Sequence, residues 1–403
     1  MSDRPTRHEV GDSREASATR CIAALAFLNF VVVTSEFSVV GMLPAMAADL
    51  GISVQSSAYF MSVFAVSASL LGPVLSFYAQ ALEPRLFLLA AASGYVVSNG
   101  VIALWPDFYV ILFMRAIQGA LLPAVVGVSA ALAIRLAGTQ RDAWAISRLN
   151  IGVVAVSIIG IPLCVQLAQG LQWSYSFALL AALAAVAACT LSAMLVRDNR
   201  PFERLNRSTL KAVLNQNFQL HLLVSFLVFS ALFCAYSYIS ILLGEALGAQ
   251  DKWLASLLLI FGLSGVIGNN LAGRYAGHSL ATTSFTVLAL FAGATSAIVL
   301  MQGNILILLV IVIAWGGAHS AAFVVTQLRM VREGKGAATV AMALNIASCN
   351  LGIATGAAVG AWSFEAFGPD GLLIATLGFL SVGAGLYSVV LTQRELPNSL
   401  QPD

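Results

Sequence analysis

Two ionisable side chains, Glu36 and Arg115, lie inside long apolar stretches of this 403-residue sequence. A charge at the centre of a membrane helix costs roughly 2.5–3.5 kcal/mol on insertion scales, so it usually serves a function and has a partner. Burial and a neighbouring guanidinium act in opposite directions on the proton affinity of a carboxyl group, so a change in their spacing can load and release a proton. We therefore predict that Glu36 is a proton carrier, the alternative being a static ion pair that joins two helices. For Arg115 the sequence leaves a structural role and a role in the proton network equally open.

The depths of these two residues in the membrane connect them. Glu36 lies seven residues before Leu43, near the outer end of one apolar stretch, and Arg115 lies seven residues after Phe108, at the outer end of another. At 1.5 Å per residue, both lie about 10 Å below the outer surface. The sequence thus predicts that Glu36 and Arg115 share one level of the membrane and can interact.

Further polar and aromatic residues inside apolar stretches are candidates for contact with a small-molecule substrate. They are Asn29, Gln118, Tyr236, Trp315, His319 and Asn345. Asn29 lies seven residues before Glu36 on the same helix face, and His319 lies one turn after Trp315. For His319, hydrogen bonding between helices and contact with substrate or a proton both stay open, and hydrogen bonding between helices is the alternative for Asn345. A place in the aromatic belt at the membrane surface is the alternative for Tyr236.

The composition requires that membrane-spanning helices position these residues. Apolar residues make up 59% of the chain and charged residues only 9%. A soluble domain carries roughly a quarter charged residues, so this chain cannot cover itself with a polar surface. We expect an all-α polytopic membrane protein in contact with the lipid bilayer. A formal net charge of +2 offers no basic surface, which excludes a nucleic-acid-binding protein.

The apolar stretches predict twelve membrane-spanning helices, since each needs about 20 residues to cross the hydrocarbon core. They lie near 21–43, 56–80, 85–105, 108–134, 143–168, 173–196, 219–243, 253–274, 280–301, 304–328, 337–364 and 370–392. If the N-terminus lies inside, the outer loops contain a single basic residue, Lys252. The other basic residues outside the spans lie on the cytoplasmic side. Positive charge is retained in the cytoplasm, so both termini are expected there.

The longest interior polar stretch divides these helices into two sets of six. The expected organisation is a cytoplasmic tail (1–20), a six-helix bundle (21–196), a cytoplasmic linker (197–218), a second six-helix bundle (219–392) and a cytoplasmic tail (393–403). Leu149-Asn150-Ile151 recurs as Leu344-Asn345-Ile346, 195 positions later, which indicates internal repetition. Two repeats of six helices are a transporter architecture, with the substrate site near the midplane of the membrane.

The sequence offers no motif for an energy source other than an ion gradient. It contains no G-x-x-x-x-G-K-[ST] loop for binding a nucleotide. It also contains neither the H-E-x-x-H motif nor the G-x-S-x-G motif, so no enzyme is expected. Its five cysteines stand singly, which predicts no metal site and no disulfide framework. We expect no cofactor, and the single membrane carboxylate favours protons over sodium as the coupling ion. His221, near the cytoplasmic end of its stretch, is predicted to be structural.

Four segments carry a family resemblance. They are Thr34-Ser35-Glu36-Phe37 with Gly41-Met42-Leu43-Pro44, Arg115-Ala116-Ile117-Gln118-Gly119, Gly152 through Gly160-Ile161-Pro162, and Asn345 through Gly352, Gly356 and Gly360. Together they resemble the twelve-helix drug:proton antiporter branch of the major facilitator superfamily, which includes bacterial sugar, nucleoside and chloramphenicol exporters. The resemblance implies a proton-transfer role for Arg115 in the R-x-x-Q-G motif. It also implies that Gly152, Gly160 and Pro162 form the antiporter motif.

The resemblance and the membrane charges together favour a proton-coupled efflux antiporter for a small organic molecule such as a drug, nucleoside or sugar. We expect a multi-pass protein of the bacterial inner membrane that works as a monomer by alternating access. A uniporter or a proton symporter for uptake is one alternative, and counterflow without a pH gradient separates it from the antiporter. A non-transporting membrane receptor is another, which predicts ligand binding without flux.

Overall fold

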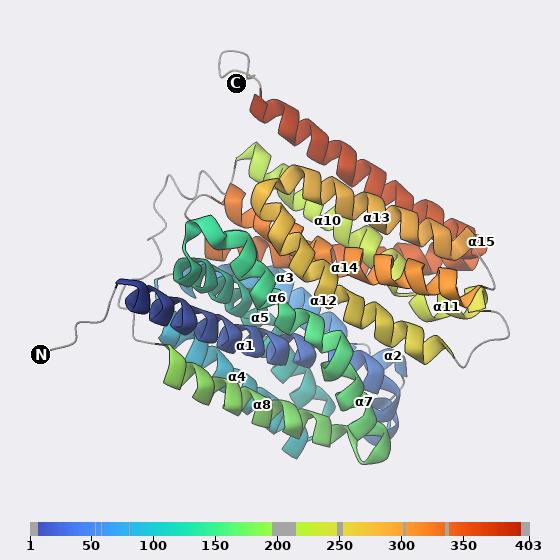
Figure 1. Ribbon diagram of the computed structural model, residues 1–403. Coiled ribbons are helices and arrows are strands. Elements are labelled where there is room, and N and C mark those ends of the chain that lie inside the picture. The colour runs from blue at the N-terminus through green and yellow to red at the C-terminus, as the bar shows by residue number, and fades with distance from the viewer. Residues whose placement is uncertain are drawn as a thin grey trace, which may run out of the picture. The chain divides into compact units, whose positions relative to one another are not determined.

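The computed structural model describes residues 7–52, 54–57, 59–79, 81–195, 215–247, 253–300, 304–334 and 338–395. Residues 197–214 of the predicted linker and Lys252 lie outside these ranges. All regular elements within them are helices (Figure 1). The chain divides into two compact units, Met1–Arg204 and Leu205–Asp403. Each unit is a helical bundle in its own right.

The described residues of the first unit form eight α-helices. They are α1 (Arg7–Leu50), α2 (Val54–Ser57), α3 (Tyr59–Ala79), α4 (Pro84–Leu104), α5 (Phe108–Ala137), α6 (Asp142–Ala155), α7 (Ile161–Gly170) and α8 (Trp173–Met194). A 3₁₀ turn, Thr139–Arg141, leads into α6. A π-helical turn, Val156–Gly160, joins α6 to α7. Pro162 explains this turn, because a proline cannot donate the backbone hydrogen bond that would continue a regular helix.

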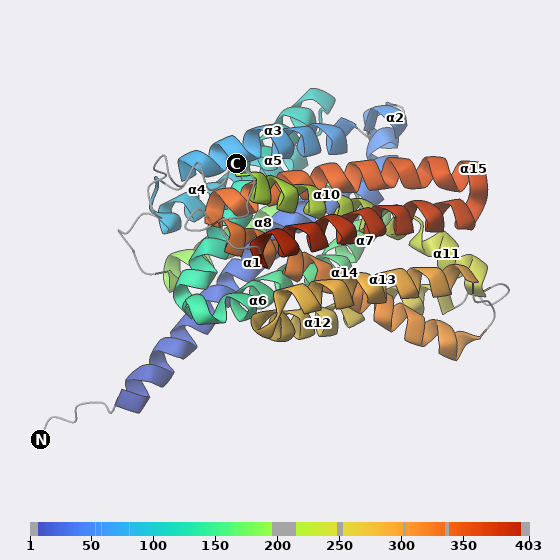
Figure 2. The same ribbon diagram turned by 90° about the horizontal axis from the view of Figure 1, so that it is seen from above.

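The helix α1 begins earlier than the hydrophobic stretch predicts. The predicted membrane span is 21–43, whereas the helix begins at Arg7, within the segment 1–20 that is predicted to be a cytoplasmic tail. The sequence has no proline between Pro5 and Pro44. The polar part of the helix therefore contains no proline that would break it. Figure 2 shows the start of α1 extending past the other helices of its unit.

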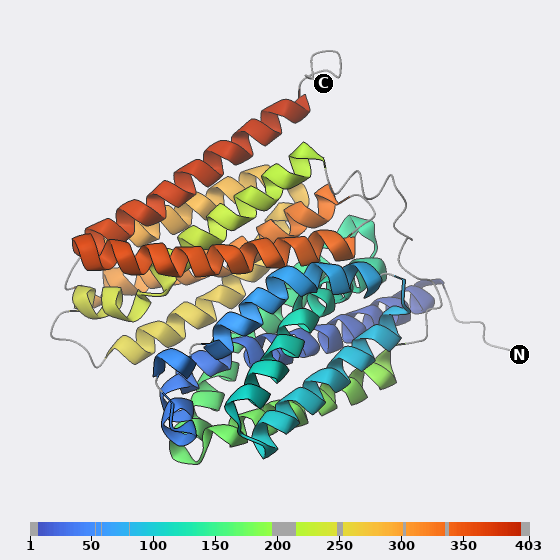
Figure 3. The ribbon, with the colours of Figure 1, turned by 180° about the vertical axis from the view of Figure 1, so that it is seen from behind.

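In the part of the second unit that the structure describes there are six α-helical elements. They are α10 (Gln216–Tyr236), α11 (Ile239–Leu247), α12 (Leu254–His278), α13 (Leu280–Leu300), α14 (Ile305–Glu333) and α15 (Ala338–Glu395). The predicted span 219–243 is interrupted, because α10 ends at Tyr236 and α11 begins at Ile239, directly after the two-residue turn Ser237-Tyr238. α15 is two helices, since Gly368 has a φ of 64° and Pro369 follows it. Figure 3 shows the two arms of α15 meeting at this break.

The apolar helices are long enough to cross a membrane. Eleven helical segments of the described residues qualify by length and composition, and the last, Ala338–Thr392, contains both arms of α15. Counting these arms separately gives twelve spans. The prediction of an all-α polytopic membrane protein with twelve membrane helices is therefore confirmed, and the differences from the predicted ranges concern helix ends and bends.

Glycine residues bring the backbones of neighbouring helices together within each unit. In the first unit, a Cβ atom at Gly152 would overlap the carbonyl oxygen of Ala26 in α1. In the second, a Cβ atom at Gly268 of α12 would overlap the carbonyl oxygen of Gly317 in α14. Small residues drive such close contacts in membranes, where helix association depends on packing rather than on the hydrophobic effect.

We expect Gly268→Ala to destabilise the second unit. The added methyl group has no room against the backbone of Gly317, so α12 and α14 must separate. Overpacking of this kind typically costs about 1–3 kcal/mol. The midpoint of thermal unfolding in detergent measures this loss. Gly293→Ala is the matched control, because an added Cβ there meets no atom within 4 Å. Equal midpoints for the two variants would contradict the close contact.

Candidate functional site

The guanidinium of Arg115 connects three helices of the first unit. Arg115 lies in α5 and is fully buried. Its Nη1 donates to the backbone carbonyl of Ser35 at 2.6 Å and its Nη2 to that of Glu36 at 3.1 Å, both in α1. Its Nε donates to the carbonyl of Phe60 in α3 at 3.1 Å. The ring of Phe64 in α3 lies 4.3 Å from the guanidinium carbon, a distance at which a cation and an aromatic face attract each other. Arg115 is therefore held by fixed backbone atoms and by an aromatic ring.

A buried polar network continues from Arg115 through Gln118. Gln118 Oε1 accepts a hydrogen bond from Arg115 Nη1 at 3.2 Å. Gln118 Nε2 donates to Ser98 Oγ at 3.0 Å and to Asn99 Oδ1 at 2.9 Å. Asn99 Nδ2 in turn donates to Ser35 Oγ at 3.2 Å. The side chain of Gln118 thus uses both of its amide atoms within the bundle, and a substrate could bind it only by breaking these bonds.

The carboxylate of Glu36 is buried beside this network without joining it. Glu36 is 7% exposed. Among the described residues, its carboxylate forms no hydrogen bond and no ion pair. Arg115 reaches the backbone carbonyl of Glu36 instead of the carboxylate. The structure therefore brings the two residues together, but the guanidinium of Arg115 forms no hydrogen bond with the carboxylate of Glu36.

Two asparagines predicted to contact substrate carry buried atoms without partners. Asn29 in α1 is fully buried, and neither its Nδ2 nor its Oδ1 has a hydrogen-bond partner among the described residues. The same holds for Oδ1 of Asn345 in α15, which is 1% exposed. A buried polar group without a hydrogen bond is costly. Both amides are therefore suited to bind a ligand or water.

An aromatic cluster surrounds His319 in the second unit. Five rings have centroids between 5.0 and 6.2 Å from that of His319. They belong to Phe233, Tyr236, Phe261, Phe291 and Phe323. The indole of Trp315 packs on two of these rings, with centroid distances of 5.6 Å to Phe261 and 6.3 Å to Phe291. The five residues that carry these rings, together with Trp315 and His319, are called the His319 cluster below.

The His319 cluster contains two polar atoms without partners. Nδ1 of His319 and Nε1 of Trp315 have no hydrogen-bond partner among the described residues, and the two side chains are 7% and 0% exposed. The four phenylalanines come from four different helices and gave no signal in the sequence. The predicted residues Tyr236, Trp315 and His319 therefore lie together, in aromatic surroundings that contain these two polar atoms.

The two glycines of the predicted antiporter motif lie against α1. Gly152 faces Ala26, and Gly160 faces Thr34, whose Oγ1 would overlap an added Cβ atom. Pro162 lies in the first turn of α7, directly after the π-helical turn. Gly152 and Gly160 therefore allow α6 and the π-helical turn to approach the helix that carries Glu36. In the described part of the chain, no group of three or more His, Cys, Asp and Glu residues could hold a metal ion.

Comparison with known proteins gives a consistent family match. The sequence model of the Major Facilitator Superfamily matches residues 25–348. An inner membrane transport protein of Escherichia coli, YdhP, is 25% identical over 379 residues, which cover 94% of this chain and 97% of that protein. A probable sugar efflux transporter of Mannheimia succiniciproducens is 27% identical over 376 residues, with 92% of both chains covered. The transporter FucP, solved in an outward conformation, superposes with a TM-score of 0.71 at 13% identity, covering 92% of this chain and 98% of FucP. This last likeness shows the fold.

Proposed function

Since the chain belongs to the Major Facilitator Superfamily and is a secondary transporter, we propose that it exports a small organic molecule in exchange for protons. The observation that carries this proposal is the Glu36 carboxylate, which is buried and has no hydrogen bond or ion pair with any described residue. A carboxylate in this state can take up a proton without first breaking an internal bond. A relative named as a probable sugar efflux transporter supports the direction of transport, and an inner membrane relative supports placement in a bacterial inner membrane.

The proposed mechanism is alternating access by a monomer. A proton entering from outside neutralises Glu36, and the substrate and the proton compete for the state that binds substrate. Within the first unit we propose Asn29 as a contact for substrate, and within the second unit the His319 cluster and Asn345. Arg115 serves this mechanism as a positioning residue, because its donors hold the backbone of α1 at Glu36. Drugs, nucleosides and sugars are the substrate classes proposed.

Reconstituted protein in liposomes tests the proposal. A thermal-shift screen of antibiotics, nucleosides and sugars first identifies a ligand, and transport of that ligand is then measured under an imposed pH gradient. An antiporter moves substrate against the direction of proton flow. Transport in the direction of proton flow would identify a symporter, and counterflow that ignores the gradient would identify a uniporter. Binding without flux would identify a receptor. Each of these three results would overturn the proposal.

We expect Trp315→Phe to weaken substrate binding. The substitution keeps an aromatic ring in the His319 cluster but removes the Nε1 donor that has no partner among the described residues. Loss of one hydrogen bond to a ligand corresponds to roughly a 5–10-fold increase in KM. The KM of counterflow measures this effect. Trp362→Phe in α15 is the matched control, since Trp362 is 65% exposed. An unchanged KM in Trp315→Phe would remove this indole from the substrate site.

A further inference from the structure

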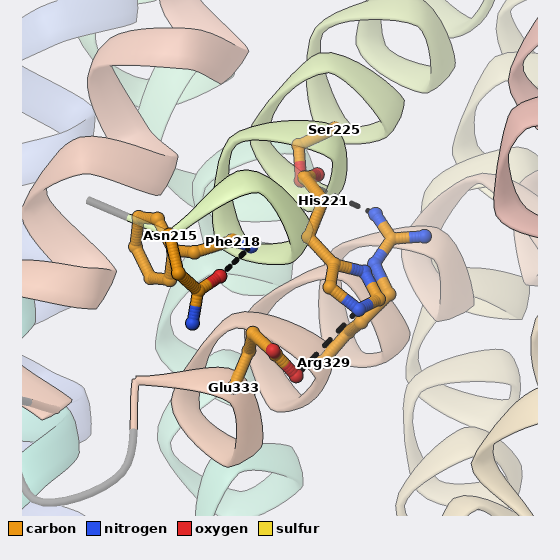
Figure 4. Close-up of polar contacts among 6 residues, drawn as sticks. All are labelled: Asn215, Phe218, His221, Ser225, Arg329 and Glu333. Carbon is orange, nitrogen blue, oxygen red and sulfur yellow. Dashed lines mark hydrogen bonds and ion pairs between the residues drawn. The ribbon is translucent and has the colours of Figure 1, made fainter. Parts of the chain in front are cut away.

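A second buried group of ionisable side chains lies in the second unit, twelve residues along α10 from Phe233 of the His319 cluster. At 1.5 Å per residue this is about 18 Å. His221 Nε2 in α10 lies 3.7 Å from Oε2 of Glu333, the last residue of α14, and the two side chains are 2% and 5% exposed. One turn away on each helix, Nη2 of Arg329 donates to Oγ of Ser225 at 3.2 Å. Figure 4 shows the two contacts side by side between α10 and α14. We call these four residues the His221 cluster.

The arms of α15 and the helix α13 close this cluster on its other sides. The ring of Tyr387 in α15 lies 5.9 Å from the His221 ring, and the Arg329 guanidinium carbon lies 5.0 Å from the same Tyr387 ring. The thiol of Cys349, also in α15, is near enough to Arg329 to interact with it electrostatically. From α13 the ring of Phe285 packs on Tyr387 at 5.3 Å. Among the described residues with a printed contact to this cluster, the charged groups that face His221 are Glu333 and Arg329, and the titratable groups beside them are Tyr387 and Cys349.

Apolar side chains separate the His221 cluster from water. Phe218 in α10 and Met330 in α14 flank it along the chain and pack with Val340 and Ala341 of α15 in one buried group. In such surroundings a single unpaired charge is costly, and a charge next to its opposite is tolerated. The environment thus makes the charge state of each member depend on that of its neighbours.

The charge balance of the His221 cluster makes it suited to bind one proton. With His221 neutral, the cluster contains the positive charge of Arg329 and the negative charge of Glu333, one turn apart on α14. A proton on His221 is attracted by Glu333 and repelled by Arg329, and histidine is the side chain whose charge normally changes near neutral pH. The added proton converts a 3.7 Å contact into an ion pair between α10 and α14. Binding of a proton therefore alters how firmly these two helices are joined.

We propose that His221 and Glu333 form a second proton-binding site, which makes the transport rate respond to cytoplasmic pH. Both residues lie near helix ends, because His221 is in the second turn of α10 and Glu333 is the last residue of α14. The distribution of basic residues places these helix ends on the cytoplasmic side. The site lies outside the residues proposed for proton coupling and for substrate binding. It requires only that the chain is a transporter, and it stands even where substrate movement is not coupled to protons.

Counterflow at equal pH on both faces of the membrane tests this site without a proton gradient. The rate is measured between pH 5 and 8 for the wild type, His221→Gln, Glu333→Gln and the control His278→Gln, whose histidine is exposed at the end of α12. We expect the ratio of variant to wild-type rate to change by about 5-fold or more across this range for His221→Gln and Glu333→Gln, since histidine titrates there. For His278→Gln the ratio stays constant.

The use of a ratio removes any pH dependence that Glu36 contributes, because every variant retains Glu36. Constant ratios across the pH range for both His221→Gln and Glu333→Gln overturn the second site. Where His221→Gln does not fold, Glu333→Gln decides by the same criterion. A failure of gradient-driven antiport bears on Glu36 alone, so the two proposals fail by different measurements.

Discussion

Glu36→Gln is expected to abolish substrate transport driven by a pH gradient while counterflow without a gradient continues. Glutamine has nearly the size of glutamate and can form hydrogen bonds, but its amide cannot take up and release a proton near neutral pH. Because the carboxylate forms no hydrogen bond or ion pair within the described part of the chain, its replacement breaks no internal contact. Liposomes with an imposed pH gradient measure the effect, and gradient-driven transport should fall to the level of empty liposomes.

A matched carboxylate on the surface controls this prediction. Glu365 in α15 is exposed, and Glu365→Gln should transport as the wild type does under the same gradient. Persistent counterflow in Glu36→Gln shows that the protein is folded and binds substrate. If Glu36→Gln still followed the imposed gradient, the coupling proton would have to bind elsewhere in the chain.

The membrane level shared by Glu36 and Arg115 could be inferred from the sequence, but the bonding atoms could not. Counting residues from the ends of two apolar stretches is enough for depth, because each residue of a helix advances 1.5 Å. Whether the guanidinium meets a carboxylate or a carbonyl depends on the rotation of α1 and α5 about their axes and on side-chain rotamers. The structure shows bonds to the carbonyls of Ser35, Glu36 and Phe60, which hydropathy does not encode.

In the second unit, too, the sequence indicates some residues of the two clusters but not the contacts between them. Tyr236, Trp315 and His319 could be selected one by one as polar or aromatic residues within apolar stretches. The phenylalanines that surround them were indistinguishable from lipid-facing ones, because nothing in a single apolar stretch tells which face is inward. His221 was predicted to be structural, and its partner Glu333 lies 112 positions away on another helix. Contacts of this range become visible only once the bundle is assembled.

Helix bounds were predictable where a local signal exists. Pro162 and Pro369 stand in the sequence at the π-helical turn and at the break in α15, since proline cannot continue a regular hydrogen-bond pattern. The extension of α1 back to Arg7 has no such signal, because polar residues in a helix outside the apolar core look the same as polar residues in a tail. Hydropathy therefore gives the membrane spans and not the full helices.

Arg115→Lys is expected to destabilise the first unit and to stop transport, although it keeps the positive charge. Arginine offers five donors in a fixed planar arrangement, whereas lysine offers a compact ammonium group. The guanidinium bonds three carbonyls and Gln118 and lies over the ring of Phe64, which one ammonium cannot reproduce. Since hydrogen bonds of charged groups contribute about 1.5–3 kcal/mol in water-soluble proteins and about 0.6 kcal/mol on average between membrane helices, we expect a loss of roughly 2–4 kcal/mol.

Thermal unfolding in detergent and counterflow measure the two parts of this prediction. Arg274→Lys in α12 is the matched control, because Arg274 is exposed, and it should unfold and transport as the wild type does. If Arg115→Lys matched that control, a positive charge near Glu36 would be sufficient and the hydrogen-bond geometry would be unnecessary. Loss of both stability and counterflow in Arg115→Lys, set against loss of gradient-driven transport alone in Glu36→Gln, would separate the residue that holds α1 in place from the residue that carries the proton.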